Sequence, residues 1–311
     1  MTLVVRDEAD VVEAQLAYHL EAGVDFVLAT DHDSQDGTRE VLEEYERRGV
    51  LRLFREEGPM RESVWRTRMA RLAATEHGAD WVINTDADEF WMPRTGTLKD
   101  AFAAVPDRVG IVWALTCHFP PRPERGEAFH ERMTARYAPT SPLNDPTSPY
   151  RPHAKAAHRA DPGIIVWFGS HRVVSSLEPL PAWHPADVLH FPFRSLEQYE
   201  RKNVRRARGD KPLGQYVKGL QASELGRSAD AYRALVLDDA AVARGHASGQ
   251  LVEDTRLRDA LAGRSPAPAT RGRFAWDDAA LRDADVVRLV RRLDVLRARL
   301  EGVERRPWAR S

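Results

Sequence analysis

The chain has 311 residues, 42% of them hydrophobic, which is enough for one large α/β domain with an appendage or for two modest domains. Its 46 Lys and Arg residues nearly balance its 47 Asp and Glu residues, so the formal net charge of -1 excludes a global field that would attract nucleic acid or an anionic membrane. The single cysteine, Cys117, excludes an internal disulfide and a cysteine-based zinc cluster. We therefore expect a cytoplasmic protein with no nucleic-acid partner and, since no apolar run approaches the ~20 residues of a membrane span, no transmembrane segment.

Residues 1–90 alternate between the two hydrophobic periods that are typical of strands and helices. We expect strands at 2–5, 25–30, 50–54 and 80–85, with helices between Val12 and Gly23, between Asp36 and Gly49, and over 61–77. Asp36 is expected to be the N-cap of its helix. This order predicts a βαβ series of parallel strands, and ligands bind beyond the carboxyl ends of such strands.

The later part of the chain has a weaker pattern. It predicts a short helix at 98–105, a buried strand at 109–119, strand-like segments at 163–169 and 188–193, and a helix at 196–208 capped by Ser195. Residues 120–163 have no clear period and are expected to be a functional loop or a disordered segment. Beyond residue 212 only helical patterns occur, interrupted by a linker at 263–272. We therefore expect a catalytic α/β domain at 1–212 and a helical C-terminal region at 213–311.

Two carboxylates, Asp86 and Asp88, follow the expected strand at 80–85. They can turn toward one point if the second lies in the ensuing turn, and carboxylate oxygens suit Mg²⁺ or Mn²⁺. Such an ion would neutralise a diphosphate leaving group. The aromatic residues of Glu89-Phe-Trp91 are candidates to line a pocket beside it. An acidic turn that only caps the next helix is the alternative.

A second acidic segment, Asp31 to Thr38, follows the expected strand at 25–30. Asp31 and Asp33 are candidates to accept hydrogen bonds from a nucleoside, whereas Asp36, Gly37 and Thr38 are residues that commonly begin a helix. Arg6 and Glu8 leave the first strand on the same side and can form a wall of the base pocket, although charged residues after a strand are more often only solvated.

The order of these segments resembles glycosyltransferase family 2 and its relatives with the GT-A fold. The resemblance is carried by Arg6-Asp-Glu8, by Asp31-x-Asp-Ser-x-Asp-Gly-Thr38 and by Trp81-Val-Ile-Asn-Thr-Asp-Ala-Asp-Glu-Phe90, whose Asp-x-Asp-Glu-Phe is similar to one subgroup. It implies a Rossmann-like, mixed but mainly parallel sheet flanked by helices, and a nucleotide-diphosphate sugar as donor.

The resemblance also implies roles for particular residues. Arg6, Glu8, Asp31 and Asp33 would contact the nucleoside, and Asp86 and Asp88 would bind Mn²⁺ or Mg²⁺ and the donor, with Arg66 or Arg68 approaching the nucleotide. A later histidine commonly completes the metal site in such enzymes, and His190 is the first candidate and His171 the second. Lys155, Arg159, Arg194, Ser195 and Lys202 are candidates to contact phosphate oxygens. Histidines satisfied by other partners and solvated basic residues are the alternatives.

An inverting enzyme also needs a general base for the acceptor hydroxyl. The candidates lie in 118–145, and we choose Glu131 among Glu124, Glu127, Glu131, Asp145, His118 and His130. The acceptor is a saccharide, a lipid or a small molecule, which the sequence does not distinguish. The C-terminal helical stripe, from Val286 to Leu300, can form a homodimer contact or pack on its own domain.

Three other interpretations remain open at this stage. A metal-dependent nucleotidyltransferase or phosphoesterase also places acidic residues and histidines at strand ends, but the first strand lacks a glycine-rich phosphate loop. A catalytically inert binding or scaffold protein with a GT-A frame is the non-enzymatic alternative. The basic runs Arg201 to Arg208 and Arg288 to Arg299 are interpreted as solvated helix faces and not as nucleic-acid contacts.

Overall fold

A computed structural model describes residues 1–139, 152–180, 184–207 and 214–263. Nine of the described strands form one mixed sheet in the order β3-β2-β1-β4-β8-β6-β12-β5, with β11 paired to β6. These strands are β1 (Thr2–Val5), β2 (Val27–Asp31), β3 (Leu51–Arg55), β4 (Trp81–Asp86), β5 (Glu89–Pro93), β6 (Val109–His118), β8 (Ala154–Arg159), β11 (Glu178–Leu180) and β12 (Ala186–His190). The expected α/β class with a mainly parallel sheet flanked by helices is confirmed.

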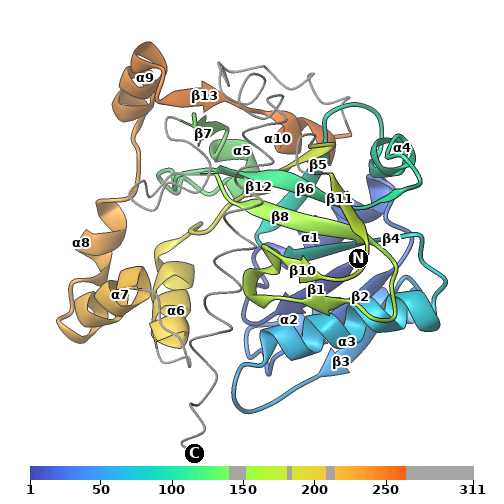
Figure 1. Ribbon diagram of the computed structural model, residues 1–311. Coiled ribbons are helices and arrows are strands. Elements are labelled where there is room, and N and C mark those ends of the chain that lie inside the picture. Colours follow the sequence, from blue (N-terminus) through green and yellow to red (C-terminus); the bar gives the residue numbers. More distant parts are fainter. Residues whose placement is uncertain (140–151, 181–183, 208–213, 264–311) are drawn as a thin grey trace, which may run out of the picture.

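The first half of the sheet, β3-β2-β1-β4, is parallel throughout and follows the expected βαβ series. Its connecting helices are α1 (Val12–Glu21), α2 (Thr38–Arg47) and α3 (Glu62–Thr75). Alternate side chains of β1 point to opposite faces of the sheet, because Leu3 and Val5 pack with α1 and α2 while Val4 packs with α3. The helices therefore cover both faces of this half (Figure 1).

The second half of the sheet is mixed, because β8 runs antiparallel to both β4 and β6, and β5 runs antiparallel to β12. Two of these strands were not expected. β8 lies within 120–163, which also contains α5 (Phe129–Arg132) and β7 (Ala135–Tyr137), so the prediction of a structureless segment was wrong for its described part. β5 begins directly after Asp88, and its Phe90 and Trp91 are fully buried in the core and do not line a pocket.

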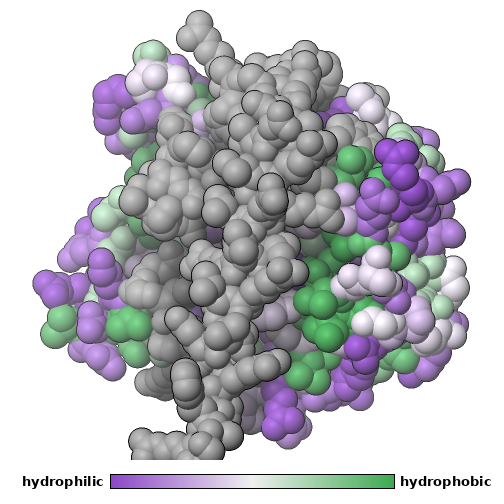
Figure 2. Space-filling view, in the orientation of Figure 1, coloured by the Kyte–Doolittle hydropathy of each residue, from purple (hydrophilic) through white to green (hydrophobic). Residues whose placement is uncertain are grey.

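The expected strand at 163–169 forms no part of the main sheet. Its residues make β9 (Ile165–Val166), which pairs with β10 (Val173–Val174), and the 3-10 turn η1 (Phe168–Ser170). Ile164 and Val166 are fully buried against α3, while Ile165 and Trp167 are about half exposed, at 44% and 53%. The hairpin therefore covers α3 with one side and leaves apolar side chains on the other, within the apolar area that lies among hydrophilic surface in Figure 2.

Helices dominate the described part beyond residue 195, but not entirely. They are α6 (Leu196–Ala207), α7 (Gly214–Glu224), α8 (Ser228–Arg233), α9 (Asp239–Ser248) and α10 (Arg256–Leu261), and α4 (Leu98–Ala103) precedes them. A strand, β13 (Leu251–Glu253), pairs antiparallel with β7, so the expectation of helices alone was wrong. α6, α7 and α8 pack together at one side of the sheet (Figure 1).

The expected cap of α6 is present. Ser195 accepts a hydrogen bond from the backbone N–H of Gln198 at 3.1 Å, as expected of a cap of α6. The linker beyond residue 263 and the stripe from Val286 to Leu300 lie outside the described residues. No helix within the described ranges has both the length and the hydrophobicity that a membrane crossing needs.

Candidate functional site

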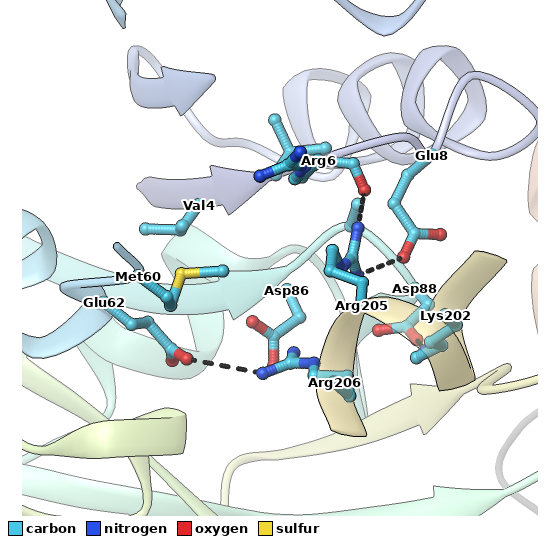
Figure 3. A pocket seen from close by; sticks show the side chains of 12 residues that line it. Val4, Arg6, Glu8, Met60, Glu62, Asp86, Asp88, Lys202, Arg205 and Arg206 are labelled. Atoms are coloured by element: carbon cyan, nitrogen blue, oxygen red, sulfur yellow. Dashed lines mark hydrogen bonds and ion pairs between the residues drawn. The ribbon is translucent and has the colours of Figure 1, made fainter. Parts of the chain in front are cut away.

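A pocket that is open to solvent lies beside α6, where β1 and β4 end (Figure 3). Its lining is mostly charged and consists of Val4, Val5, Arg6, Glu8, Met60, Glu62, Asp86, Ala87, Asp88, Lys202, Arg205 and Arg206. The predicted Arg6, Glu8, Asp86, Asp88 and Lys202 therefore meet in one pocket at the carboxyl edge of the sheet.

Asp86 is the last residue of β4, and its carboxylate meets two cations from distant parts of the chain. Arg66 of α3 donates a hydrogen bond to Oδ1, and the Lys155 ammonium of β8 lies 3.1 Å from Oδ2. Burial alone would raise the pKa of Asp86, but the charges of Lys155 and Arg66 outweigh it and lower the pKa. Asp86 is therefore an ionised carboxylate held between two cations.

Arg66 is completely buried and uses its whole guanidinium. Nε donates to Glu62 at 3.0 Å, and Nη1 donates to the carbonyl oxygen of Thr85 at 2.7 Å. Lys155 is similarly enclosed, because its ammonium also pairs with Glu89 at 2.7 Å. Burial would lower the pKa of Lys155, but Asp86 and Glu89 raise it overall, so the ammonium stays charged.

Asp88, in the turn between β4 and β5, is held by α6 and β12. The ammonium of Lys202 donates to its Oδ2 and also to the carbonyl oxygen of Pro192, the latter at 3.0 Å. His190 Nε2 lies 3.6 Å from the same Oδ2. Burial would raise the pKa of Asp88, but Lys202 and His190 hold it well below its usual value. His190 and Lys202 thus lie beside Asp88, while their roles toward a metal ion and a phosphate stay predictions.

The interpretation of the basic run from Arg201 as a solvated face was wrong for Lys202, Arg205 and Arg206, whereas Arg201 does not line the pocket. Lys202, Arg205 and Arg206 lie on the side of α6 that faces the pocket (Figure 3). Arg205 donates to the carbonyl oxygen of Arg6, and Arg206 lies 3.8 Å from Glu62. Their spacing of i, i+3 and i+4 puts side chains on one helical face, and this was the signal available in the sequence.

Arg194 stabilises the pocket wall and is not placed to contact a ligand. Its side chain is 1% exposed, donates to both Glu8 and Asp10, and also donates to the carbonyl oxygen of Phe191 at 2.8 Å. Burial would lower the pKa of Arg194, but Glu8 and Asp10 raise it overall. Arg194 therefore fixes the loop after β1, including Glu8, against the segment that follows β12.

We call the segment from Asp31 to Thr38 the Asp31 turn. Its first two carboxylates, Asp31 and Asp33, accept hydrogen bonds from residues that are close to them in the sequence. Asp31 is fully buried and accepts hydrogen bonds from Arg39 Nε at 2.8 Å and from the Ser34 backbone N–H at 3.2 Å. Asp33 has a positive φ of 53° and accepts from the side chain of Gln35 at 3.0 Å. Neither Asp31 nor Asp33 lines the pocket.

Asp36 does not cap α2 as expected. Gly37 occupies the N-cap position with a φ of 97°, which glycine adopts without the strain of a side chain. Asp36 instead accepts from the backbone N–H of Thr38 and of Ala9, each at 3.1 Å. Because the backbone N–H of Glu8 also donates to Thr38 Oγ1 at 2.9 Å, the Asp31 turn positions the loop that carries Arg6 and Glu8.

The remaining candidates lie apart from Asp88. His171 Nδ1 lies 2.9 Å from the carbonyl oxygen of Ala154. Arg68 pairs with Glu56 at 2.7 Å, and Glu131 is an exposed residue of α5 that does not line the pocket. Arg159 donates to the carbonyl oxygen of Val109 and so does not reach toward the pocket. The structure thus brings Arg66, and not Arg68, to the Asp-x-Asp turn.

His118 lies behind His190 and was named only among the candidate bases. The Nδ1 atoms of the two rings are 3.0 Å apart, so one of them donates to the other. His190 therefore has a partner on each side, Asp88 at Nε2 and His118 at Nδ1. Asp145, another candidate base, lies outside the described residues.

The expected divalent metal ion would need oxygen or nitrogen atoms at this turn that no other group occupies. Among the described residues, no three His, Cys, Asp or Glu side chains converge to hold an ion. Both oxygens of Asp86, and Oδ2 of Asp88, already pair with Arg66, Lys155 or Lys202. An ion that bound both carboxylates would have to displace cations from Asp86 and lie beside Lys202, against electrostatic repulsion. The residues present therefore do not fit a resident Mn²⁺ or Mg²⁺ ion.

The comparison with protein families supports a glycosyltransferase. Residues 5–122, less than half of the chain, match the model of glycosyltransferase family 92. No curated protein matches the chain. The match agrees with the expectation that the chain is a glycosyltransferase. Its assignment to family 2 and to the Asp-x-Asp-Glu-Phe subgroup stays a prediction.

Among solved structures, S. aureus TarS 1-349 in complex with UDP-GlcNAc is 16% identical, with coverage of 73% of this chain and 71% of that chain and a TM-score of 0.36. A structure of GalNAc-T7 with UDP, GalNAc and Mn²⁺ is 13% identical, with coverage of 75% and 53% and a TM-score of 0.36. Likeness at this level carries no information about the substrate or the metal of this chain.

Proposed function

We propose that the chain transfers a sugar from a nucleoside-diphosphate sugar to an acceptor hydroxyl, with the donor diphosphate in the pocket beside Asp86 and Asp88. One observation carries the proposal. Basic side chains of α6, namely Lys202, Arg205 and Arg206, line the pocket beside this turn, at the carboxyl edge of a sheet whose strands β2 to β6 lie within the match to a glycosyltransferase model. Charge-assisted donors in such a position suit phosphate oxygens.

The chemistry follows from the charge that develops during transfer. The acceptor oxygen forms a bond to C1 of the sugar, the bond from C1 to the β-phosphate oxygen breaks, and the acceptor proton passes to a base or to solvent. The leaving diphosphate gains negative charge, which preorganised cations stabilise more strongly in a pocket than in water. Lys202, Arg205 and Arg206 are positioned for this role, and Asp86 and Asp88 hold their neighbouring cations in place.

The nucleoside is proposed to lie toward the end of β1. Arg6 and Glu8 line that side of the pocket, and Val5 is paired in register with Asp31 of β2. Asp31 would then act on the nucleoside through the loop that the Asp31 turn positions, or directly after Arg39 moves away. In this proposal residues 1–212 form the catalytic unit and 213–311 an extension.

The proposed function is tested by isothermal titration of the chain with UDP, GDP, ADP and dTDP and their common sugar conjugates, in buffer that contains Mn²⁺. We expect one nucleotide series to bind and its sugar conjugate to be consumed with release of the nucleoside diphosphate. Asp88→Asn should weaken binding about tenfold, because Lys202 loses its charged partner. The matched control is Asp230→Asn, an exposed residue of α8 that pairs with Arg233.

Three results would contradict the proposal in different ways. Absence of binding by every nucleotide would remove the donor site. Equal binding by the Asp88 and Asp230 variants would move the site away from the Asp-x-Asp turn. Binding of a nucleotide sugar that stays intact with every acceptor offered, and in water, would identify a binding protein in place of an enzyme.

A further inference from the structure

The face of α6 that borders the pocket combines three basic side chains, Lys202, Arg205 and Arg206 (Figure 3). We propose that these three groups bind the donor diphosphate directly, so that the chain binds its donor without a divalent metal ion. The inference rests on the proposed function and deepens it, because it assigns the neutralisation of the diphosphate to the protein's own cations.

Unused hydrogen-bond donors are the first argument. The Nε atoms of Arg205, Arg206 and, across the pocket, Arg6 are buried and have no hydrogen-bond partner among the described residues. A buried donor of a charged group without an acceptor is costly and calls for an explanation. The oxygens of a diphosphate between α6 and the end of β1 would supply the acceptors.

The ion pairs of the same arginines are the second argument. Arg205 Nη2 lies 3.8 Å from Glu8, and Arg206 Nη1 lies 3.8 Å from Glu62. Both separations are longer than a hydrogen bond, so these pairs orient the guanidinium groups without consuming their donors. Arg205 Nη1 donates to the carbonyl oxygen of Arg6, so a diphosphate would bind to the remaining donors of Arg205 and to those of Arg206 without breaking a close ion pair.

The third argument is that cations already occupy oxygens of both carboxylates. Lys155 and Arg66 pair closely with Asp86, and Lys202 pairs closely with Asp88. A dication would have to compete with these groups for the carboxylate oxygens, whereas a diphosphate binds to the cations themselves. Asp88 therefore holds Lys202 at the pocket, and Lys202, Arg205 and Arg206 take the place that a metal ion would have.

The experiment compares metal-free and metal-containing binding. The whole chain is treated with excess EDTA and titrated calorimetrically with UDP, GDP, ADP and dTDP, and the titration that gives binding is repeated with Mn²⁺ and with Mg²⁺. We expect dissociation constants that agree within about twofold in the three conditions. We also expect the affinity to fall as the salt concentration rises, because the contacts are ionic.

Variants identify the groups responsible. Arg205→Met and Arg206→Met should each weaken metal-free binding about tenfold, and Lys202→Met should do so more strongly if that variant folds. If Lys202→Met does not fold, the Arg205 and Arg206 variants still test the inference, because the ion pairs of these arginines are 3.8 Å long and contribute little to folding. Arg201→Met is the matched control on the same helix, since Arg201 pairs with Glu197 and does not line the pocket.

The outcomes separate this inference from the proposed function. Binding that requires Mn²⁺ or Mg²⁺ would overturn the inference and leave the nucleotide-sugar donor standing. Metal-free binding that the Arg205 and Arg206 variants keep at full strength would also overturn it. Failure of every nucleotide to bind, with or without metal, would overturn the proposed function itself.

Discussion

Two acidic clusters follow strands of the same sheet, and they are built in opposite ways. In the Asp31 turn, the carboxylate of Asp31 has partners that are close in the sequence, namely Ser34 and Arg39, both within eight residues of it. At the turn of Asp86 and Asp88, the carboxylates have partners that are distant in the sequence, namely Arg66, Lys155 and Lys202 of three different elements. Local partners make a rigid turn, whereas distant partners appear only when the whole fold assembles.

This difference teaches where a ligand site is to be sought. A turn whose carboxylates are occupied by backbone N–H groups and a neighbouring side chain supports other parts of the structure. A turn that gathers cations from across the chain holds them at one place at a considerable desolvation cost, which is a feature of functional sites. The following predictions test whether the two clusters differ in this way.

The largest expected effect is that of Arg66→Met. The substitution leaves Glu62 and Asp86 buried without their guanidinium partner, so the free energy of unfolding should fall by about 3–5 kcal/mol. The control is Arg68→Met, two residues along the same helix, where the side chain is 40% exposed and pairs with Glu56. It should cost about 0–1 kcal/mol. Urea unfolding measures both, and equal losses would show that the distant cations at Asp86 have no special weight.

A smaller effect per residue is expected from acid, through histidines that support the second half of the sheet. Burial lowers the pKa of His19, His158 and His184 to about 4 in each case. Their rings are neutral in the folded chain, and His19 uses this state, because Nε2 accepts from the Trp91 N–H of β5 at 3.0 Å while Nδ1 lies 2.8 Å from the carbonyl oxygen of Gln15.

The sign follows from linkage. The unfolded chain takes up protons on these histidines below about pH 6.5, whereas the folded chain does so only near pH 4, so stability is lost as the pH falls through this window. Each histidine contributes up to about 3 kcal/mol of this loss. Urea unfolding at several pH values between 7.5 and 4.5 measures the slope, and His184→Gln should reduce it. A stability that does not change between pH 6.5 and pH 4.5 would contradict the prediction.

The same contrast explains what could be predicted from the sequence. The strands β1 to β4 and their helices follow from hydrophobic periods, because each buries its apolar residues against neighbours in the chain. β8 was missed because its sequence, Ala-Lys-Ala-Ala-His-Arg, is buried largely through small residues, and its polar Lys155 is explained only by Asp86 and Glu89. A central strand of this kind has no apolar period to detect.

The candidate site was predictable to a similar extent. The Asp86 and Asp88 pair and its place at a strand end follow from local sequence, and the helix α6 with its Ser195 cap was also expected. The role of the basic face of α6 could not be predicted. Helical spacing places Lys202, Arg205 and Arg206 on one face, but it does not indicate which part of the structure that face contacts. That depends on a contact between residues more than one hundred positions apart, which the fold alone supplies.

The smallest expected effect is that of Asp36→Ala in the Asp31 turn. The substitution removes the hydrogen bonds from the backbone N–H of Thr38 and Ala9, so unfolding should become easier by about 1–2 kcal/mol. Because Asp36 does not line the pocket, nucleotide affinity should stay within about twofold of the unsubstituted chain. Asp33→Asn, which removes the charge of a half-exposed carboxylate and keeps a residue that tolerates the φ of 53°, is the control and should change stability by about 0.5 kcal/mol or less. Thermal unfolding and nucleotide titration of both variants test this. A loss of affinity in the Asp36 variant as large as that of Asp88→Asn would show that the two clusters share one function, because the local turn would then bind the donor and not only support the loop beside it.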